Sequence, residues 1–144
     1  MPIYADEPLA EPSRCAIVVD RALPAGRAAN AAAVVAFTLG KRHPDVAGSD
    51  LIDGSGCHHP GLIPIGIAVV SATAAELSDL RNRAAKAGLD VVDFPVQGQE
   101  TTDYGRFGAL VASVPAEALN YVGVGLYGPR KMVGRFVGKF PLLK

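Results

Sequence analysis

The sequence predicts a single α/β domain, on three grounds. Short runs rich in valine and isoleucine alternate with longer segments of helical pattern, giving the order strand–helix four times. Strands that alternate with helices are typical of layered α/β folds. The length of 144 residues suits one compact domain, and 49% of the residues are apolar, enough for a core. We therefore predict a mixed, mostly parallel sheet of about four strands with helices on both faces.

Local signals place the individual elements. Strands are expected at residues 15–20, 63–70, 89–94 and 120–128, and helices at 27–42, 71–88, 103–113 and from Pro129 to Gly138. The segment 27–42 is rich in alanine and apolar on nearly every side, so we expect a helix that is buried on most sides. Ser71 or Thr73 is expected to be the N-cap of the second helix, and with Thr73 the spacing to Glu76 is that of a capping box. Pro129 opens the last helix at a position where its missing N–H is tolerated.

Two segments lie outside this pattern. Residues 1–13 contain acidic residues and prolines but no apolar core of a signal peptide, so we interpret them as a flexible N-terminal tail. The domain then spans residues 14–144. Residues 43–62 form a long loop in which "LID" makes a short strand at most. Loops of this length are often functional or lie at an interface.

Composition narrows the class of protein. No apolar run reaches the ~18 residues of a membrane span, so we expect no membrane association. Cys15 in an apolar run and Cys57 in a polar loop are typical of free thiols in a cytoplasmic protein. The net charge is zero, with 14 basic and 14 acidic residues, which argues against a general nucleic-acid coat. Residues 127–144 nevertheless contain several basic residues and no acidic one.

Two predicted strand-to-helix turns combine a glycine, a basic residue and the exposed N–H groups of a helix start, which together suit an anion. The turns span residues 20–30 and 126–131. If their strands are parallel neighbours, both helix starts lie at one edge of the sheet, where ligands bind in open α/β folds. The residues expected to converge there are Gly26, Arg27, Asn30, Gly128, Arg130 and Lys131. The alternative is that the glycines only form turns and the arginines are solvated.

The last predicted helix repeats positive charge every four residues. Lys131, Arg135 and Lys139 have the spacing at which like charges repel along a helix. A solvated basic face is one interpretation, and a phosphate-bearing partner explains the stripe better. Asn30 is interpreted in two ways: as a donor into the anion site, or as a local hydrogen bond near the helix start.

All three histidines lie between residues 43 and 59, near Cys57. The adjacent Cys57, His58 and His59 lack the C-x2–4-C or H-x3–5-H spacing of a zinc site, so we expect no metal and no other cofactor. His59 precedes Pro60 and is a candidate titrating group at the site, or a residue that shapes a turn.

The polar loop at residues 97–103 is a candidate for acid–base chemistry. Its candidate catalytic residues are Glu100, Thr101 and Asp103. The alternative is that Thr101, Thr102 or Asp103 caps the following helix. Because no GxSxG, P-loop or GxGxxG motif occurs, the residues leave open whether the chain is an enzyme.

The opening "CAIVVDRALPAGRAANAAAVVAFTLG" and the closing "YVGVGLYGPRKMVGRFVGKFPLL" resemble the second class of peptidyl-tRNA hydrolases, typical of archaea and eukaryotes. More closely, the chain is similar to a bacterial family of unknown function that is expected to share that fold. The likeness covers residues 15–144. It implies a peptidyl-tRNA hydrolase II-like fold, in which Gly128-Pro129 forms the final turn and "VGKFPLL" the tail.

The sequence departs from the hydrolases at their polar positions. With Leu23 and Gly26 as anchors, the family's glutamine and histidine fall on Ala33 and Ala36. The family's Asp-x-Gly-x-Thr loop is occupied by residues 96–100, which keep the glycine and lack the aspartate. The resemblance therefore implies the fold more than the reaction.

Three functional hypotheses follow. The first is binding of a small anionic or phosphate-bearing ligand at the two helix starts, with or without catalysis. The second is a hydrolase of aminoacyl or peptidyl esters of RNA, with His59 and the loop at 97–103 in place of the missing groups. The third is a non-enzymatic homodimer that uses residues 43–62 as its interface.

Overall fold

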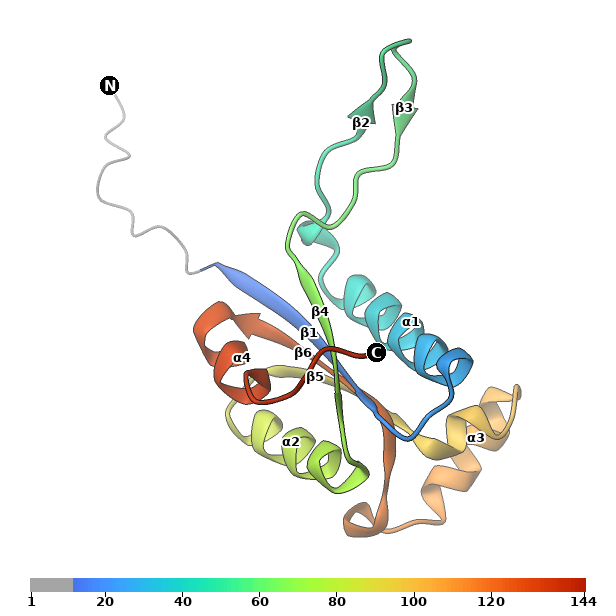
Figure 1. The fold of residues 1–144 in the computed structure, drawn as a ribbon. Coiled ribbons are helices and arrows are strands. Elements are labelled where there is room, and N and C mark those ends of the chain that lie inside the picture. Colours follow the sequence, from blue (N-terminus) through green and yellow to red (C-terminus); the bar gives the residue numbers. More distant parts are fainter. Residues whose placement is uncertain (1–11) are drawn as a thin grey trace.

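The computed structural model describes residues 12–144 of the chain (Figure 1). In chain order the elements are β1 (Ser13–Asp20), α1 (Ala25–Arg42), the 3-10 helix η1 (Pro44–Val46), β2 (Leu51–Ile52), β3 (His58–His59), β4 (Ile67–Ala72), α2 (Ala74–Lys86), β5 (Asp90–Pro95), η2 (Val96–Gln99), α3 (Tyr104–Ala112), η3 (Ala116–Ala118), β6 (Tyr121–Pro129) and α4 (Arg130–Val137). The prediction of a single α/β domain with a mixed four-stranded sheet is confirmed.

The main sheet has the strand order β4-β1-β6-β5. β1 is parallel to β4, whereas β6 is antiparallel to both of its neighbours, β1 and β5. Three strands thus run in one direction, but the reversed strand lies inside the sheet. Two of the three pairings are therefore antiparallel, and the prediction of a mostly parallel sheet is wrong. The cause is α3, which packs on η2 at the end of the sheet and does not cross a sheet face (Figure 1). The chain therefore re-enters the sheet from the end at which it left.

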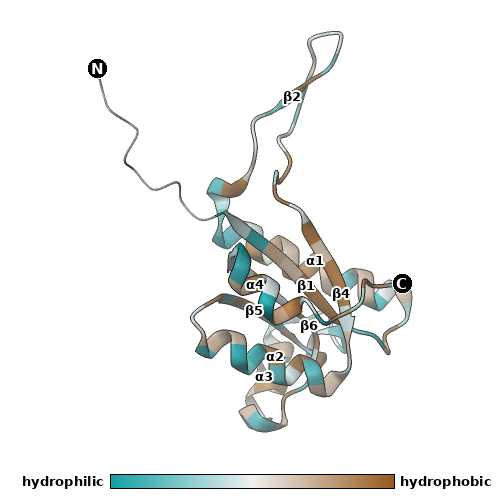
Figure 2. Ribbon diagram, turned by 60° about the vertical axis from the view of Figure 1, so that its left-hand side comes forward, coloured by the Kyte–Doolittle hydropathy of each residue, from teal (hydrophilic) through white to brown (hydrophobic). Residues whose placement is uncertain are grey.

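Helices cover both faces of the sheet, as predicted. β1 is buried on both sides because successive side chains of a strand point to opposite faces. Cys15, Ile17 and Val19 pack with α1, while Ala16 and Val18 belong to the core formed with α2 and α4. Figure 2 shows hydrophilic residues along α2 and α4, on helices whose inner sides are apolar.

Helix ends follow the local signals. The capping box of α2 is confirmed: the Glu76 N–H donates to Thr73 Oγ1 at 3.2 Å, and the Thr73 N–H donates to Glu76 Oε1 at 3.0 Å. Gly138 is the C-cap of α4. At the start of the domain, Ser13 already belongs to β1, one residue before the predicted domain boundary at residue 14. The expectation of a flexible tail otherwise concerns residues 1–11, which lie outside the described residues.

The expectation that the first helix is buried on most sides is wrong for the single chain. Only Ala28, Ala31, Val35 and Leu39 of α1 are buried. The outward face stays exposed although it is apolar, and Phe37 has an exposed fraction of 85%. The alanine content established the helix, but it did not establish what covers its second face.

The long predicted loop contains a projecting hairpin, here called the arm (residues 47–66; Figure 1). Its short strands β2 and β3 pair antiparallel, with Leu51 opposite His59 and Ile52 opposite His58. The Gly48 N–H donates to the Leu62 carbonyl at 2.8 Å and closes the base of the arm. The predicted short strand at "LID" is confirmed, whereas β3 was not predicted.

None of the helices between residues 12 and 144 combines the length and the apolar character that crossing a membrane requires.

Candidate functional site

The antiparallel pairing of β1 and β6 separates the two predicted anion-binding turns. Ser13 at the start of β1 pairs with Pro129 at the end of β6, so α4 begins beside the start of β1. α1 instead begins beyond the end of β1, and the eight residues of this strand span roughly 26 Å. The predicted convergence of Gly26, Arg27 and Asn30 with Gly128, Arg130 and Lys131 is therefore wrong.

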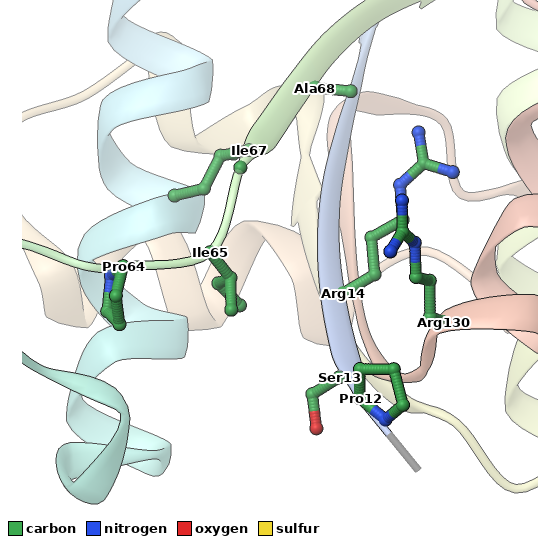
Figure 3. A pocket seen from close by; sticks show the side chains of 9 residues that line it. Pro12, Ser13, Arg14, Pro64, Ile65, Ile67, Ala68 and Arg130 are labelled. Atoms are coloured by element: carbon green, nitrogen blue, oxygen red, sulfur yellow. The ribbon is translucent and has the colours of Figure 1, made fainter.

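Each half of the predicted corner has a cavity of its own. The first, here called the arginine cavity, has a volume of about 590 Å³ and lies at the start of α4. It is lined by Pro12, Ser13, Arg14, Pro64, Ile65, Gly66, Ile67, Ala68 and Arg130. Figure 3 shows the Arg14 and Arg130 side chains on the same side of β1, with Pro64 and Ile65 across the strand. The cavity thus has a cationic side and an apolar side.

The two arginines of this cavity have no carboxylate partner among residues 12–144, where the ion pairs involve other cations. Arg14 lies against the second turn of α4, since a Cβ added at Gly134 would be 3.4 Å from Arg14 Nη1. The start of α4 has no acidic residue in its first turn and no side-chain cap. Its first N–H, that of Arg130, donates to the Pro12 carbonyl at 2.8 Å. The positive charge here is uncompensated within the described part of the chain.

Gly128 and Lys131 have other positions than predicted. A Cβ added at Gly128 would overlap the side chain of Leu89, which lies between α2 and β5. This glycine therefore allows β6 to pack closely against Leu89. Lys131 is exposed and does not line the arginine cavity. Of the predicted second turn, only Arg130 faces the cavity.

A second cavity, here called the polar cavity, lies at the start of α1 and has a volume of about 640 Å³. It is lined by Gly26, Arg27, Asn30, Gly98, Gln99, Glu100, Thr101 and Thr102. Gln99 Nε2 donates to the Arg27 carbonyl at 2.9 Å and to Asn30 Oδ1 at 3.2 Å. The start of α1 is thereby tied to the loop that follows β5, two segments that the sequence analysis had treated separately.

The candidate catalytic residues divide between three places. Glu100 and Thr101 line the polar cavity. Asp103 is the N-cap of α3, because its Oδ1 accepts from the Arg106 N–H at 2.9 Å, which supports the capping interpretation. His59 lies on the arm, which projects from the opposite end of the molecule to α3 (Figure 1). The expectation that His59 joins residues 97–103 is therefore wrong within one copy of the chain.

Carboxylates of the arm hold its histidines. His59 Nε2 lies 2.9 Å from Asp53 Oδ2, and this hydrogen bond lowers the pKa of Asp53, with help from the backbone N–H groups of Cys57 and Ser55. His58 Nδ1 lies 3.5 Å from Asp50 Oδ2 on the other face of the hairpin. Within residues 12–144, no three His, Cys, Asp or Glu side chains gather in a way that could hold a metal ion.

The two cysteines differ in reactivity. Cys57 is exposed on the arm, and Cys15 is buried in β1. Burial raises the pKa of Cys15 to about 11, so its thiol stays protonated at neutral pH. Cys57 is therefore the accessible thiol in the described part of the chain.

Sequence reasoning missed Arg14. It stands in the second position of β1, directly after the expected tail, and it pairs with Gly128 of β6. The pairing of the first strand with the last would have identified it, but no local signal gives that pairing.

The fold and these cavities define a single-domain α/β protein with a reversed inner strand, a projecting arm and two open cavities at opposite ends of β1. The chain belongs to the family described as "Protein of unknown function (DUF2000)", which matches residues 13–144. The solved structure of the protein of unknown function Atu0240 from Agrobacterium tumefaciens strain C58 is similar, with a TM-score of 0.82. The two are 16% identical, and the likeness covers 90% of this chain and 96% of the other. No curated protein matches the chain.

Proposed function

We propose that this chain binds a phosphate-bearing ligand and that Arg14 and Arg130 hold its phosphate in the arginine cavity. One observation carries the proposal: two guanidinium groups line the same cavity, and no carboxylate between residues 12 and 144 neutralises them. Like charges at short range repel, and an anion between them turns the repulsion into two attractions. Arginine suits phosphate because its planar fork donates two parallel hydrogen bonds.

The surroundings of the two arginines support the same ligand. α4 begins at this cavity, and although the Arg130 N–H donates to the Pro12 carbonyl, neither an acidic residue in the first turn nor a side-chain cap offsets the positive end of the helix. Lys131 and Arg135 add exposed positive charge on the same helix. The opposite wall, with Pro64, Ile65 and Ile67, is apolar and suits a carbon skeleton or a ring. We infer a small phosphate ester with an apolar or aromatic part, and the volume of about 590 Å³ is ordinary for such a ligand.

Calorimetric titration with inorganic phosphate and with a nucleoside monophosphate tests this proposal. We expect Arg14→Ala and Arg130→Ala each to remove charge-assisted hydrogen bonds worth about 1.5–3 kcal/mol, which lowers the affinity roughly 10- to 150-fold. Lys86→Ala is the matched control, because it removes one exposed positive charge at the end of α2. Equal affinities for all variants, or equal weakening by the control, would show that no phosphate binds between the arginines.

RNA is the alternative phosphate-bearing partner. A strand that contacts Arg14, Arg130, Lys131 and Arg135 would bind with an affinity that falls steeply as salt concentration rises. Titration with a short single-stranded RNA and with a mononucleotide at increasing salt distinguishes the two ligands, since only the RNA would contact Lys131 and Arg135. Equal effects of Lys131→Ala on both ligands would argue against an RNA-specific role.

A second candidate function is hydrolysis of an ester on RNA, as the resemblance to the second class of peptidyl-tRNA hydrolases suggests. Arg27 and Asn30 of α1 share the polar cavity with Glu100 and Thr101. Glu100 and Thr101 belong to the loop after β5, where those hydrolases have their Asp-x-Gly-x-Thr motif. We propose that the chain shares their fold, because its strand–helix order and its Gly128-Pro129 turn agree with theirs. Cleavage of peptidyl-tRNA that Glu100→Gln abolishes would support this function; no cleavage at high protein concentration would end it.

A further inference from the structure

The outer face of α1 has no charged residue between Arg27 and Lys41. Its exposed members are Ala29, Asn30, Ala33, Val34, Phe37, Thr38 and Gly40. Phe37 points away from the sheet, because it lies half a helical turn from the buried Val35 and Leu39 positions. A helix that is apolar on both sides is normally covered on both, and an exposed apolar patch marks an interaction site. Within residues 12–144, the part of the outer face of α1 around Phe37 therefore lacks a partner.

The arm also exposes aliphatic side chains. Leu51, Ile52, Leu62 and Ile63 are all exposed, with a fraction of 69% for Leu62. The paired strands of the arm are two residues long each, and a two-stranded hairpin in water is only marginally stable without a surface to pack on. The arm and the outer face of α1 thus have the same need for an apolar partner.

We infer that a second copy of this chain covers both surfaces. The arm follows α1 and the short η1, and it projects beyond the end of α1 (Figure 1). If the α1 helices of two copies pack antiparallel about a two-fold axis, the arm of each copy lies beside the α1 start of the other. A two-fold interface is self-complementary, so one apolar helix face is matched by its own copy. Ala29 and Ala33 leave room for the Phe37 ring of the second copy.

Charge favours the same arrangement. The arm contains Asp50 and Asp53 and no lysine or arginine, and Asp45 of η1 precedes it. The α1 start, against which the arm of the second copy would lie, has Arg21 and Arg27. An acidic arm thus meets a basic helix start, and electrostatic complementarity of this kind fixes the register of an interface. An arm seated on its own copy's basic α4 is excluded, because the arm points away from the body of the molecule (Figure 1).

The exposed area is sufficient for a dimer. The large exposed side chains of α1 and the arm present on the order of 500 Å² of apolar surface per copy, which with the arm backbone approaches the roughly 800 Å² per partner of a standard interface. The arrangement also has a chemical consequence. It brings the His58 and His59 of one copy toward the polar cavity of the other, where Arg27, Asn30 and Glu100 lie.

Sedimentation velocity of the full chain at micromolar concentration tests the dimer. We expect the wild type to sediment as a dimer and Phe37→Asp as a folded monomer, because a carboxylate would be buried at the two-fold axis. Ala85→Asp is the matched control: Ala85 is exposed on α2, which packs on the opposite face of the sheet from α1. A monomeric wild type overturns the inference, and so does dissociation caused by Ala85→Asp but not by Phe37→Asp.

Cross-linking tests the antiparallel direction. Cys57 on the arm is accessible and Cys15 is buried, so a bismaleimide with a long spacer reacts at Cys57. One copy of the chain keeps Cys57, and the second copy lacks Cys57 and carries one introduced cysteine to which the reagent can link. We expect covalent dimers when Thr102→Cys is introduced at the polar cavity, and none when Lys86→Cys is introduced at the end of α2. Efficient wild-type cross-links between the two Cys57 residues would overturn the antiparallel arrangement, since it holds the two arm tips far apart.

Discussion

Two glycines of β6 face α1 at different distances, and replacing each by alanine tests how closely this helix is seated. Gly123 and Gly125 are two residues apart and therefore point to the same face of the sheet. A Cβ added at Gly123 would lie 3.5 Å from the Ala31 Cβ, an ordinary contact. A Cβ added at Gly125 would overlap Val35 and would lie 2.7 Å from Leu39 Cδ1. Val35 and Leu39 are both buried, so neither can move aside freely.

The two substitutions should therefore change stability in opposite directions. Alanine restricts the unfolded chain relative to glycine, which stabilises by about 0.4–1 kcal/mol where the native backbone tolerates it. We expect this small gain for Gly123→Ala. At Gly125 an overpacking penalty of about 1–3 kcal/mol exceeds the gain. The net loss of roughly 1–2 kcal/mol would lower the Tm by about 3–8 °C in a chain of this length.

Urea unfolding followed by circular dichroism measures both effects. Equal slopes m for the wild type and the two variants would show that the surface exposed on unfolding is unchanged, so that shifts of the midpoint report shifts of the free energy of unfolding. The reasoning is refuted if Gly125→Ala is as stable as Gly123→Ala, because α1 would then sit further from β6 than the structure shows. Since the start of α1 forms one wall of the polar cavity, Gly125→Ala should also weaken any ligand bound there.

Two further predictions concern stability. The bidentate Arg42 hydrogen bonds, and after them the His43 hydrogen bond, lower the pKa of Asp90 below its ordinary value of about 3.9. The contribution of ionised Asp90 to the free energy of unfolding is therefore complete above that value and is lost as the pH falls through the lowered pKa. Asp90→Asn should thus be less stable than the wild type at pH 7, with the difference shrinking toward pH 2.5 in urea titrations; a difference constant with pH would contradict this. Thr73→Ala should lower the stability by about 0.5–2 kcal/mol through loss of the α2 cap, whereas Thr38→Ala, on the outer side of α1, should have a smaller effect.

Local signals predicted the elements well because each depends on neighbouring residues. The alanine-rich segment established α1, and Thr73 with Glu76 established the start of α2. The order of strands and helices gave the α/β class for the same reason. These features need no information about which distant segments meet.

The site was harder to predict because it depends on strand direction. The two basic turns would meet only if the strands before α1 and α4 were parallel, and their antiparallel pairing places the turns at opposite ends of β1. The same reversal places Arg14, at the start of the first strand, beside Arg130. Nothing within a few residues of either arginine indicates this meeting. The residues of the polar cavity were predicted as two separate sites, one at the start of α1 and one in the loop after β5. Gln99 joins these two segments through its hydrogen bonds to Arg27 and Asn30.

The position of β6 has a consequence for how the protein is made. β6 lies between β1 and β5, yet it is synthesised after both, so these two strands cannot close the sheet until residues 121–129 have emerged from the ribosome. Pairing of the first strand with the last is the most non-local contact of the fold, and contacts of this kind slow folding. During synthesis Arg14 therefore has no second arginine beside it until β6 and the start of α4 have been made. A ligand that needs both arginines would bind only molecules in which β6 has been inserted between β1 and β5, and not chains that are still shorter.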